Sequence, residues 1–518
     1  MRSRGYIAAV IGAGLLLAGV TLPVAYLVIR AMEVGPAEFQ ALVFRPRNLV
    51  LLRNTLGLLV GVLACSTLLA FPLAWLTSRA NMTGKRFWAL AGVLPLAIPS
   101  YLMAYAMLAM GGNMGAVAQL TDWVMPRISG YWGALFILTL CNFPYLFFNL
   151  RAALLTLDPT MEEVGYSLGQ GHRQILTRVL MPQLRPAFLS GSLLISLHVI
   201  SDFAAVSLMR YETLSYALYT QYNSAFNRSY AACLALMLIA MTVILLIAES
   251  RFLRRLRYDR VGSAGPRKKA PAALGKWAPV AYGYVIVLFL ISVVAPVGTM
   301  IYWALKADMV SLLPDLRASL IGSVMASFPA ALFATLLVIP IVYLSVRAPS
   351  RLTRFIERST YFGYSVPALA FALGLVFFSL RLAPALYQTL FLLVYAYTVH
   401  YMAEAMGPIR SALYQTSPKI EEAARSLGYS RIQAIFKVTF PLIRNGMLVS
   451  TAFVFLSCMK ELHLTIILSP LGYNTLAVNV WSFIEEAFFA EAAPYALTIL
   501  AFSGMFVGVL LLQERKYA

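Results

Sequence analysis

The sequence predicts an all-α membrane protein with about twelve transmembrane helices, arranged as two tandem parallel repeats of six. Hydrophobic residues make up 60% of the 518 residues and charged residues only 12%, the mean hydropathy is +0.77, and one polar segment occurs twice. A water-soluble chain could not bury this much apolar surface. The alternation typical of barrel strands is missing, so helices of roughly 20 apolar residues are expected to span the bilayer.

The apolar runs divide into six in each half of the chain. The expected spans lie near 6–29, 50–76, 87–110, 131–155, 187–209, 230–249, 279–304, 319–345, 359–380, 386–408, 447–469 and 493–513. The first run is too long for a typical signal peptide, which favours an uncleaved first span. The predicted domains are a first half (1–250), a basic linker (251–278) and a second half (279–518).

The excess of Lys and Arg, a formal net charge of +20, is expected in cytoplasmic loops and not in a nucleic-acid interface. Bases gather in residues 79–86, 251–276 and 347–358, whereas residues 485–491 carry three Glu and no base. This asymmetry predicts that both termini, the linker and the repeated polar segments face the cytoplasm. The loop 30–53, with four arginines, opposes the pattern locally.

The repeated polar segment reads EEVGYSLGQGHRQILTRVLMPQLRPA from Glu162 and EEAARSLGYSRIQAIFKVTFPLIRNG from Glu421. The separation is constant, since 421 − 162 and 441 − 182 are both 259. Earlier in each half the separation is 268, as in Arg79 and Arg347, so nine extra residues are expected in the outer loop 112–130. Each half has an even number of spans, so both copies enter the membrane from the same side and form a parallel repeat.

Each polar segment is expected to form two short helices joined by a turn. In the second copy, Pro418 suits a first helical position, and the Glu pair suits the positive end of the helix dipole. Gly428 suits a left-handed position after the helix. A second, amphipathic helix is expected from Arg431 to Thr439, ended by Pro441. The Glu side chains either cap the helix or meet basic groups of a partner, and the sequence does not decide between these roles.

These segments resemble the EAA loop of permease subunits of ABC importers. The matching residues are Glu162, Glu163, Gly169 and Pro182 in the first copy, and Glu421, Glu422, Ala423, Ala424, Gly428 and Pro441 in the second. The first copy departs from the family pattern, with Val164 and Gly165 in place of the two alanines. The resemblance implies that both loops form coupling helices that dock in grooves of ATPase subunits, with slightly different docking in the two halves.

A second resemblance narrows the family. SDFAAVSLM from Ser201 and MKELHLTIILSPLGYNTLAVNVW from Met459 resemble segments of fused, twelve-span permeases of the ferric-iron importer family, with a departure at His463-Leu464. The resemblance implies a bacterial inner-membrane permease that works with two copies of an ATPase and a periplasmic binding protein. It implies iron(III) as cargo, with thiamine or aminoethylphosphonate as the alternative, and it places ATP and magnesium in the ATPase.

Ionisable residues within the spans are candidates for the translocation path, because charges are costly in a membrane. Asp202 and Glu461 correspond at the separation of 259, with His198 and Lys460 nearby. The acids either line the path and attract a cation, or hold helices together through hydrogen bonds or a pair with Lys460. No metal site is assigned.

The chain carries no nucleotide-binding signature of its own. GxxxxGK[ST], zinc-ligand spacings and a nucleophile elbow are absent, so we expect a transport subunit and not an enzyme. The four cysteines lie in apolar runs without CxxC spacing, which favours packing. A secondary transporter with Asp202 and Glu461 as ion sites is the alternative from another class, but such a carrier would leave the two coupling loops unexplained.

Overall fold

The computed structural model describes residues 21–157, 160–223, 227–255 and 272–517, together with Gly14 and Gly19. The beginning of the predicted span 6–29 and most of the predicted linker 251–278 therefore lie outside the described residues. Within them, every regular element is a helix, and Ala80 and Ala272 form one isolated bridge. The all-α class is confirmed.

Seven helices of the described residues are long and apolar enough to cross a membrane, and nine are if each bent pair counts as one span. The seven are Pro46–Ser78, Gly130–Thr156, Arg173–Ser201, Arg228–Phe252, Gly275–Ala304, Met309–Arg347 and Ile432–Met459. Each coincides with a predicted span. Described helices also overlap the remaining predicted spans, at Thr21–Met32, Leu390–Gln415 and Phe489–Tyr517, so the count of twelve stays a prediction.

The predicted spans near 87–110 and 359–380 are each formed by helices that meet at a sharp bend. The first consists of α4 (Lys85–Ala91), η1 (Leu94–Ala97) and α5 (Ser100–Met110), with a bend of 92°. The second consists of α17 (Arg351–Ser365) and α18 (Ala368–Leu382), with a bend of 98°. Pro99 and Pro367 lie at the breaks, because the residue before a proline is driven out of the helical region.

The described chain forms two compact units. The first unit comprises Arg45–Ala217 and Ala240–Lys306, and the second comprises Met1–Phe44, Leu218–Ile239 and Ala307–Ala518. The predicted halves 1–250 and 279–518 follow the repeat in the sequence, and the compact units differ from them. Residues 1–44, from the first half, belong to the same unit as 307–518, whereas residues 279–306, from the second half, belong to the same unit as 45–217.

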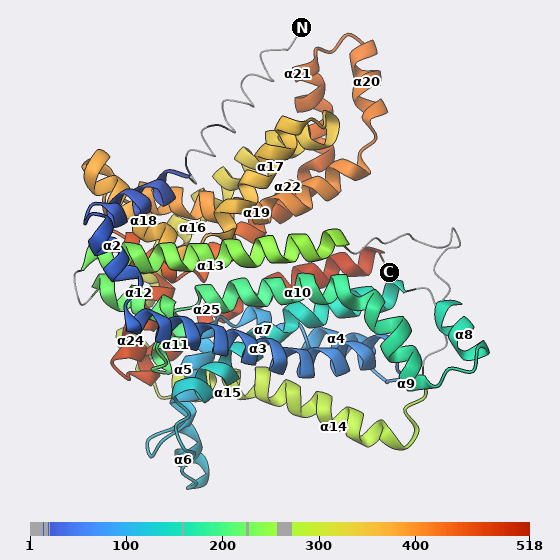
Figure 1. The fold of residues 1–518 in the computed structure, drawn as a ribbon, viewed down its shortest axis with the longest axis horizontal. Helices are drawn as coiled ribbons and strands as arrows, with labels where there is room; N and C mark the ends of the chain where they lie inside the picture. The colour runs from blue at the N-terminus through green and yellow to red at the C-terminus, as the bar shows by residue number, and fades with distance from the viewer. Residues whose placement is uncertain are drawn as a thin grey trace. The chain divides into compact units, whose positions relative to one another are not determined.

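Three long helices form the centre of the first unit: α3 (Pro46–Ser78), α7 (Gly130–Thr156) and α10 (Met181–Ser201) pack against one another (Figure 1). A Cβ built on Gly191 of α10 would lie 2.9 Å from the Cα of Leu146 on α7, so only glycine permits this approach. The other elements are α6 (Ala116–Thr121), α8 (Thr160–Ser167), α9 (His172–Ile175), η2 (Leu176–Leu180), α11 (Ala204–Leu208), η3 (Gly275–Trp277), α14 (Ala278–Phe289), η4 (Leu290–Val294) and α15 (Ala295–Ala304).

The second unit repeats this centre with α16 (Met309–Arg347), α19 (Leu390–Gln415) and α22 (Phe440–Met459). Ser450, which corresponds to Gly191 (450 − 191 = 259), donates a hydrogen bond from Oγ to the carbonyl oxygen of Ala405 at 2.7 Å. The other elements are α2 (Pro36–Val43), η5 (Pro384–Leu386), α20 (Pro418–Ser426), α21 (Arg431–Ala434), η6 (Ile435–Thr439), α23 (His463–Leu468), α24 (Leu476–Glu485) and α25 (Phe489–Tyr517). Helices α12 (Leu214–Asn223) and α13 (Arg228–Arg255) run from one unit into the other.

The predicted spans 187–209 and 447–469 end earlier than expected. Helix α10 ends at Ser201 and α22 at Met459, and the short helices α11 and α23 follow after two or three non-helical residues. An ionisable residue stands at each break: Asp202 in the first and Glu461 in the second.

Candidate functional site

The repeated polar segments form the same two-helix structure in both units. Helix α8 is followed by α9 in the first unit, and α20 by α21 in the second. Pro418 stands at the first position of α20, and Ser417 caps it with its hydroxyl oxygen. Glu162 and Glu163 lie in the first turn of α8, and Glu421 lies in the first turn of α20. The expected helix start at Pro418 is therefore observed, with Glu421 in the first turn and Glu422 just beyond it.

Both first helices end on a glycine in the left-handed conformation, with φ of 75° at Gly169 and 93° at Gly428. The following amide donates back across the turn in each copy, from Gln170 to the carbonyl of Gly165 at 3.1 Å and from Tyr429 to that of Ala424 at 3.2 Å. No other part of the described chain lies within 4 Å of a Cβ built on either glycine. The expected stop at Gly428 is confirmed, and the space above both glycines is open.

The first Glu of each pair is held by an arginine of the same unit. Arg79 Nη1 lies 3.2 Å from Glu162 Oε1, and Arg347 Nε donates to Glu421 Oε1 at 3.2 Å. The exposed fractions of the side chains are 11% and 4% in the first pair, and 11% and 13% in the second. We call Arg79–Glu162 and Arg347–Glu421 the anchoring pairs.

The same arginines also hold the end of the preceding long helix. Arg347 Nη2 donates to the carbonyl oxygen of Thr416, the residue after α19, at 2.7 Å. Arg79 Nη2 makes the matching contact with the carbonyl of Leu157, after α7, at 3.5 Å. Arg79 thus connects the end of α3 with the end of α7 and with α8. Arg347 connects the end of α16 with the end of α19 and with α20 in the same way.

The anchoring pairs separate the roles of the two Glu residues that the sequence left open. Glu162 and Glu421 turn inward to their own chain, whereas Glu163 and Glu422 are exposed. Ala424 is buried and Ala423 is exposed. Large apolar side chains are also exposed at matching positions of both segments: Met161 and Ile420, at 50% and 44%, and Leu168 and Leu427, at 72% and 80%. Each segment therefore exposes one acid and two apolar side chains at matching positions, and the first segment also exposes Val164 and Tyr166.

The prediction that the second short helix ends at Pro441 is wrong. The chain stays helical from Ile432 to Met459, and from Arg173 to Ser201 in the first unit. A π-helical turn lies directly before each proline region, at Leu176–Leu180 and Ile435–Thr439. Proline lacks an N–H and its ring clashes with the carbonyl four residues earlier. The wider turn accommodates the proline without ending the helix, so the second short helix of each segment is the extension of a long one.

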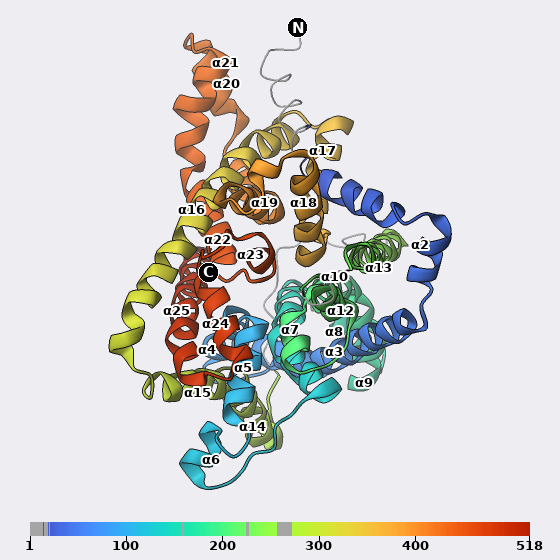
Figure 2. The same cartoon turned by 90° about the vertical axis from the view of Figure 1, so that its left-hand side faces the viewer.

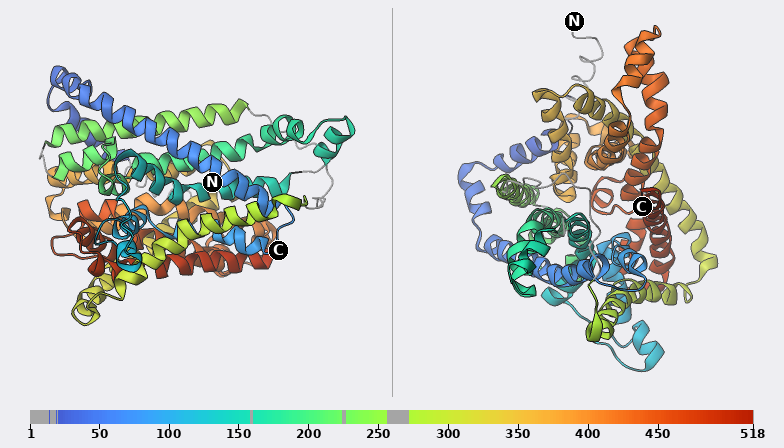
Figure 3. Two further views of the ribbon diagram at one scale, coloured as in Figure 1. Left: turned by 90° about the horizontal axis from the view of Figure 1, so that it is seen from below. Right: turned by 90° about the vertical axis from the view of Figure 1, so that its right-hand side faces the viewer.

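The second segment projects from its unit. In Figure 1 and Figure 2 the α20–α21 hairpin extends beyond the ends of α17 and α19, and the same orange segment projects in the right-hand view of Figure 3. In the first unit, α8 and α9 lie at the corresponding end of α10 (Figure 1). Since a π-turn and a continuous helix connect each projection to α10 or α22, a displacement of the projection would move a long helix.

Asp202 and Glu461 occupy equivalent places and make equivalent contacts. Asp202 Oδ1 accepts from the amide of Ala205 at 2.8 Å, and Glu461 Oε1 accepts from the amide of Leu464 at 2.9 Å. Both side chains are buried, at 8% and 7% exposure. Each acid therefore caps the short helix that follows the break in a long helix. Glu461 also accepts from the hydroxyl of Tyr401 on α19. Whether the two acids line a translocation path or hold helices together stays a prediction.

His198 and Lys460 lie in different surroundings. His198 Nδ1 is 2.9 Å from the carbonyl oxygen of Leu194, and its Nε2 is 3.0 Å from the hydroxyl of Tyr145. The carbonyl can only accept, so the proton is assigned to Nδ1 and the Tyr145 hydroxyl donates to Nε2. Lys460 is half-buried. Among the residues that the structure describes, no group of three or more His, Cys, Asp or Glu is placed to hold a metal ion.

Two sets of residues were missed by sequence reasoning. Arg79 and Arg347 were noted as repeated bases, but their pairing with the first Glu of each loop was not, although both members of each pair keep their repeat positions. Glu404 was also missed. It accepts a hydrogen bond from Ser457 Oγ at 2.6 Å. In the repeat, Glu404 corresponds to Tyr145 and Ser457 to His198, which are hydrogen-bonded to each other in the first unit. A carboxylate within the apolar run 386–408 was the available signal.

Comparison with known proteins agrees with this arrangement. The family described as "Binding-protein-dependent transport system inner membrane component" matches residues 67–258 and again residues 341–515. The chain is 34% identical over 502 residues to the Fe(3+)-transport system permease protein FbpB 2 of Haemophilus influenzae, covering 96% of each chain.

Two further relatives are more distant. The ferric transport system permease protein FbpB of Actinobacillus pleuropneumoniae is 20% identical over 470 residues, which are 85% of this chain and 67% of the relative. The molybdenum transport system permease protein ModB of Escherichia coli is 29% identical over 217 residues, which are 40% of this chain and 94% of ModB. With two matched copies that together cover most of its length, the chain belongs to the family of inner-membrane components of binding-protein-dependent transport systems.

Proposed function

We propose that this chain is the transmembrane permease of an ATP-driven, binding-protein-dependent iron(III) importer, moved by ATPase subunits that dock on its two polar segments. The observation that carries the proposal is the similarity to FbpB 2 of Haemophilus influenzae, whose name describes Fe(3+) transport, over 96% of both chains. The similarity extends over both halves of the chain, which supports the view that both halves have the same transport role as in FbpB 2.

The geometry of α8 and α20 supports their role as coupling helices. Each is short, begins on a capped or acidic first turn, ends on a left-handed glycine and is fixed to its unit by an anchoring pair. A stiff element transmits force, whereas a loose loop would absorb it. The exposed faces with Glu163 and Leu168, and with Glu422 and Leu427, are suited to a groove that has apolar walls and a basic group.

In this proposal, two copies of an ATPase hold ATP and magnesium, and a periplasmic binding protein delivers iron(III) from the other side. Both termini and both polar segments face the cytoplasm, as the distribution of Lys and Arg supports. Nucleotide binding draws the two ATPases together. The movement passes through α8 and α20 into α10 and α22, and so changes the access of the path between the helices.

The test is uptake of radioactive iron(III) by a strain that lacks the gene, with and without the restored chain. The proposal predicts that the intact chain restores uptake and that a Glu163→Lys, Glu422→Lys double variant does not, although it reaches the membrane. Restored uptake of molybdate without that of iron would contradict the cargo. Iron uptake that persists when the chain's co-purifying ATPase is inactivated would contradict the coupling and favour an ion-driven carrier.

A further inference from the structure

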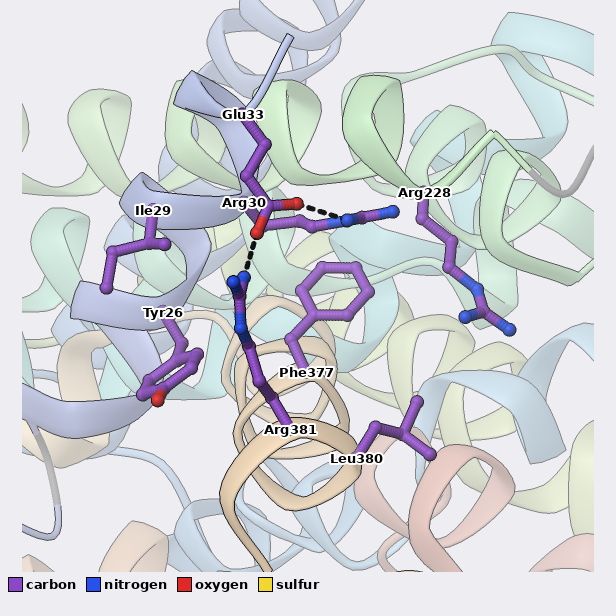
Figure 4. A pocket seen from close by; sticks show the side chains of 8 residues that line it. All are labelled: Tyr26, Ile29, Arg30, Glu33, Arg228, Phe377, Leu380 and Arg381. Carbon is purple, nitrogen blue, oxygen red and sulfur yellow. Dashed lines mark hydrogen bonds and ion pairs between the residues drawn. The ribbon is translucent and has the colours of Figure 1, made fainter. Parts of the chain in front are cut away.

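A pocket in the second unit combines three arginines with one glutamate. Its volume is about 490 Å³, and its charged lining residues are Arg30, Glu33, Arg228 and Arg381. They come from three separate segments: the end of helix Thr21–Met32, the first residue of α13 and the last turn of α18 (Figure 4). Three positive charges against one negative charge give the pocket a formal charge of +2.

The single carboxylate in the pocket is already engaged. Glu33 pairs with Arg30 and with Arg381, one through each carboxylate oxygen, and dashed lines mark both contacts in Figure 4. Burial alone would raise the pKa of Glu33. The hydrogen bonds from Arg30 and Arg381 lower this pKa by more than burial raises it, so the carboxylate stays ionised. No carboxylate of the described residues pairs with Arg228. The pocket therefore has positive charge that its own walls do not neutralise.

The pocket lies at the end of the second unit opposite to the coupling helix. Arg381 stands shortly before α19 begins, and α20 follows shortly after α19 ends. A helix of 26 residues separates the two ends by about 39 Å, at 1.5 Å per residue. With α20 in the cytoplasm, as the proposed function has it, the pocket opens at the outer face of the membrane.

The walls also have an apolar side. Ile29 and Leu380 are 47% and 37% exposed beside the charged groups, and Phe377 is buried beneath them, with the guanidinium carbon of Arg30 5.8 Å from its ring centroid. Phe377 thereby fixes one wall of the pocket. A ligand that carries an anionic group next to an apolar part would meet both kinds of surface.

We propose that this pocket binds the phosphate group of an anionic ligand at the outer face, with Arg228 and Arg381 as the groups that hold it. The planar guanidinium offers paired N–H donors that match the oxygens of a phosphate. Glu33 holds Arg30 and Arg381 in place through its two ion pairs. A net charge of +2 repels a bare cation, so the pocket is not a station for the ion itself. The phosphate comes either from solution or from a lipid headgroup.

The experiment uses the purified full-length chain and two probes. In lipid-free detergent, the unfolding temperature is measured against inorganic phosphate, with chloride at equal ionic strength as reference. In nanodiscs of phosphatidylcholine with or without phosphatidylglycerol, the anionic lipid retained per chain is measured by mass spectrometry. The variants are Arg228→Gln and Arg381→Gln, and Arg317→Gln, an exposed arginine elsewhere in the same unit, is the matched control.

The proposal predicts that one probe binds the unaltered chain and the control equally, and binds each pocket variant at least tenfold more weakly. A loss confined to inorganic phosphate identifies a dissolved ligand, and a loss confined to phosphatidylglycerol identifies a lipid headgroup. If neither probe distinguishes the pocket variants from Arg317→Gln, the proposal is wrong. These readouts do not involve iron uptake, so a failure of the proposed cargo would leave them unchanged.

Discussion

Replacing Arg347 by Gln is expected to loosen the second coupling helix without unfolding the unit. The change removes the hydrogen bond to Glu421 at 3.2 Å and the one to the carbonyl of Thr416 at 2.7 Å. Breaking a buried ion pair costs ~3–5 kcal/mol. Here Glu421 keeps the hydroxyl of Tyr343, which donates at 2.8 Å, and the paired side chains are still 11% and 13% exposed. We therefore expect a loss of about 2 kcal/mol at α20, below the range for a fully buried pair.

A loss of this size corresponds to roughly a 30-fold rise in local opening. Hydrogen exchange followed by mass spectrometry should show amides of α20 exchanging faster by about that factor, while amides in the middle of α19 stay unchanged. In the reconstituted complex, ATP hydrolysis should continue while uptake falls. Arg354→Gln is the matched control: it removes the same charge a few residues away, in α17, where Arg354 Nε donates to the nearby carbonyl of Ser350.

The double variant Arg347→Gln, Glu421→Gln makes the reasoning refutable. The double variant leaves no buried carboxylate without its partner. The amides of α20 should therefore exchange more slowly than expected from adding the stability losses of the two single variants, and the difference should be about 1–2 kcal/mol. Strict additivity, or equal exchange of α20 in Arg347→Gln and Arg354→Gln, would show that the anchoring pair does not hold the helix.

Three other changes have expected outcomes. Gly428→Ala forces a side chain into the left-handed region, so α20 should lose about 1–2 kcal/mol, measured as faster exchange of its amides; unchanged exchange would rule out the observed turn. The double variant Glu163→Lys, Glu422→Lys should insert normally but co-purify with less ATPase, and undiminished co-purification would remove the exposed acids from the interface. Asp202→Asn with Glu461→Gln should keep the unfolding temperature within a few degrees, because the amide oxygens still accept from the capped helices. A fall in uptake would then assign a role to the charges, whereas unchanged uptake would leave these acids as helix caps.

The sequence predicted the elements that depend on local pattern. Long apolar runs indicated the positions of most long helices, and the glycine after the short helix of the second copy predicted the left-handed turn at Gly428, which the structure repeats at Gly169. The breaks in the predicted spans near 87–110 and 359–380 were missed although Pro99 and Pro367 were visible. Hydropathy averages over a window and does not register a single residue that changes the direction of the chain.

The anchoring pairs could not be predicted from pattern alone. Arg347 and Glu421 are 74 residues apart, and hydropathy does not say which helix ends meet in space. Their repeat positions held the information, because Arg79 and Glu162 keep the same two separations of 268 and 259. The compact units were also beyond local reasoning: the grouping of α14 and α15 with the first half depends on contacts such as the hydrogen bond from Trp303 to the carbonyl of Ala109 at 3.1 Å.

The most direct test of the central claim, that both polar segments receive the ATPase, is photo-crosslinking in intact cells. A benzophenone amino acid is placed at Leu168 or Leu427, which are 72% and 80% exposed, and at Leu471, which is 86% exposed after α23, as the control. If both segments receive the ATPase, Leu168 and Leu427 will each capture a protein with a Walker motif and Leu471 will not. If neither coupling position captures an ATPase in complexes that still hydrolyse ATP during uptake, the polar segments are not its docking sites.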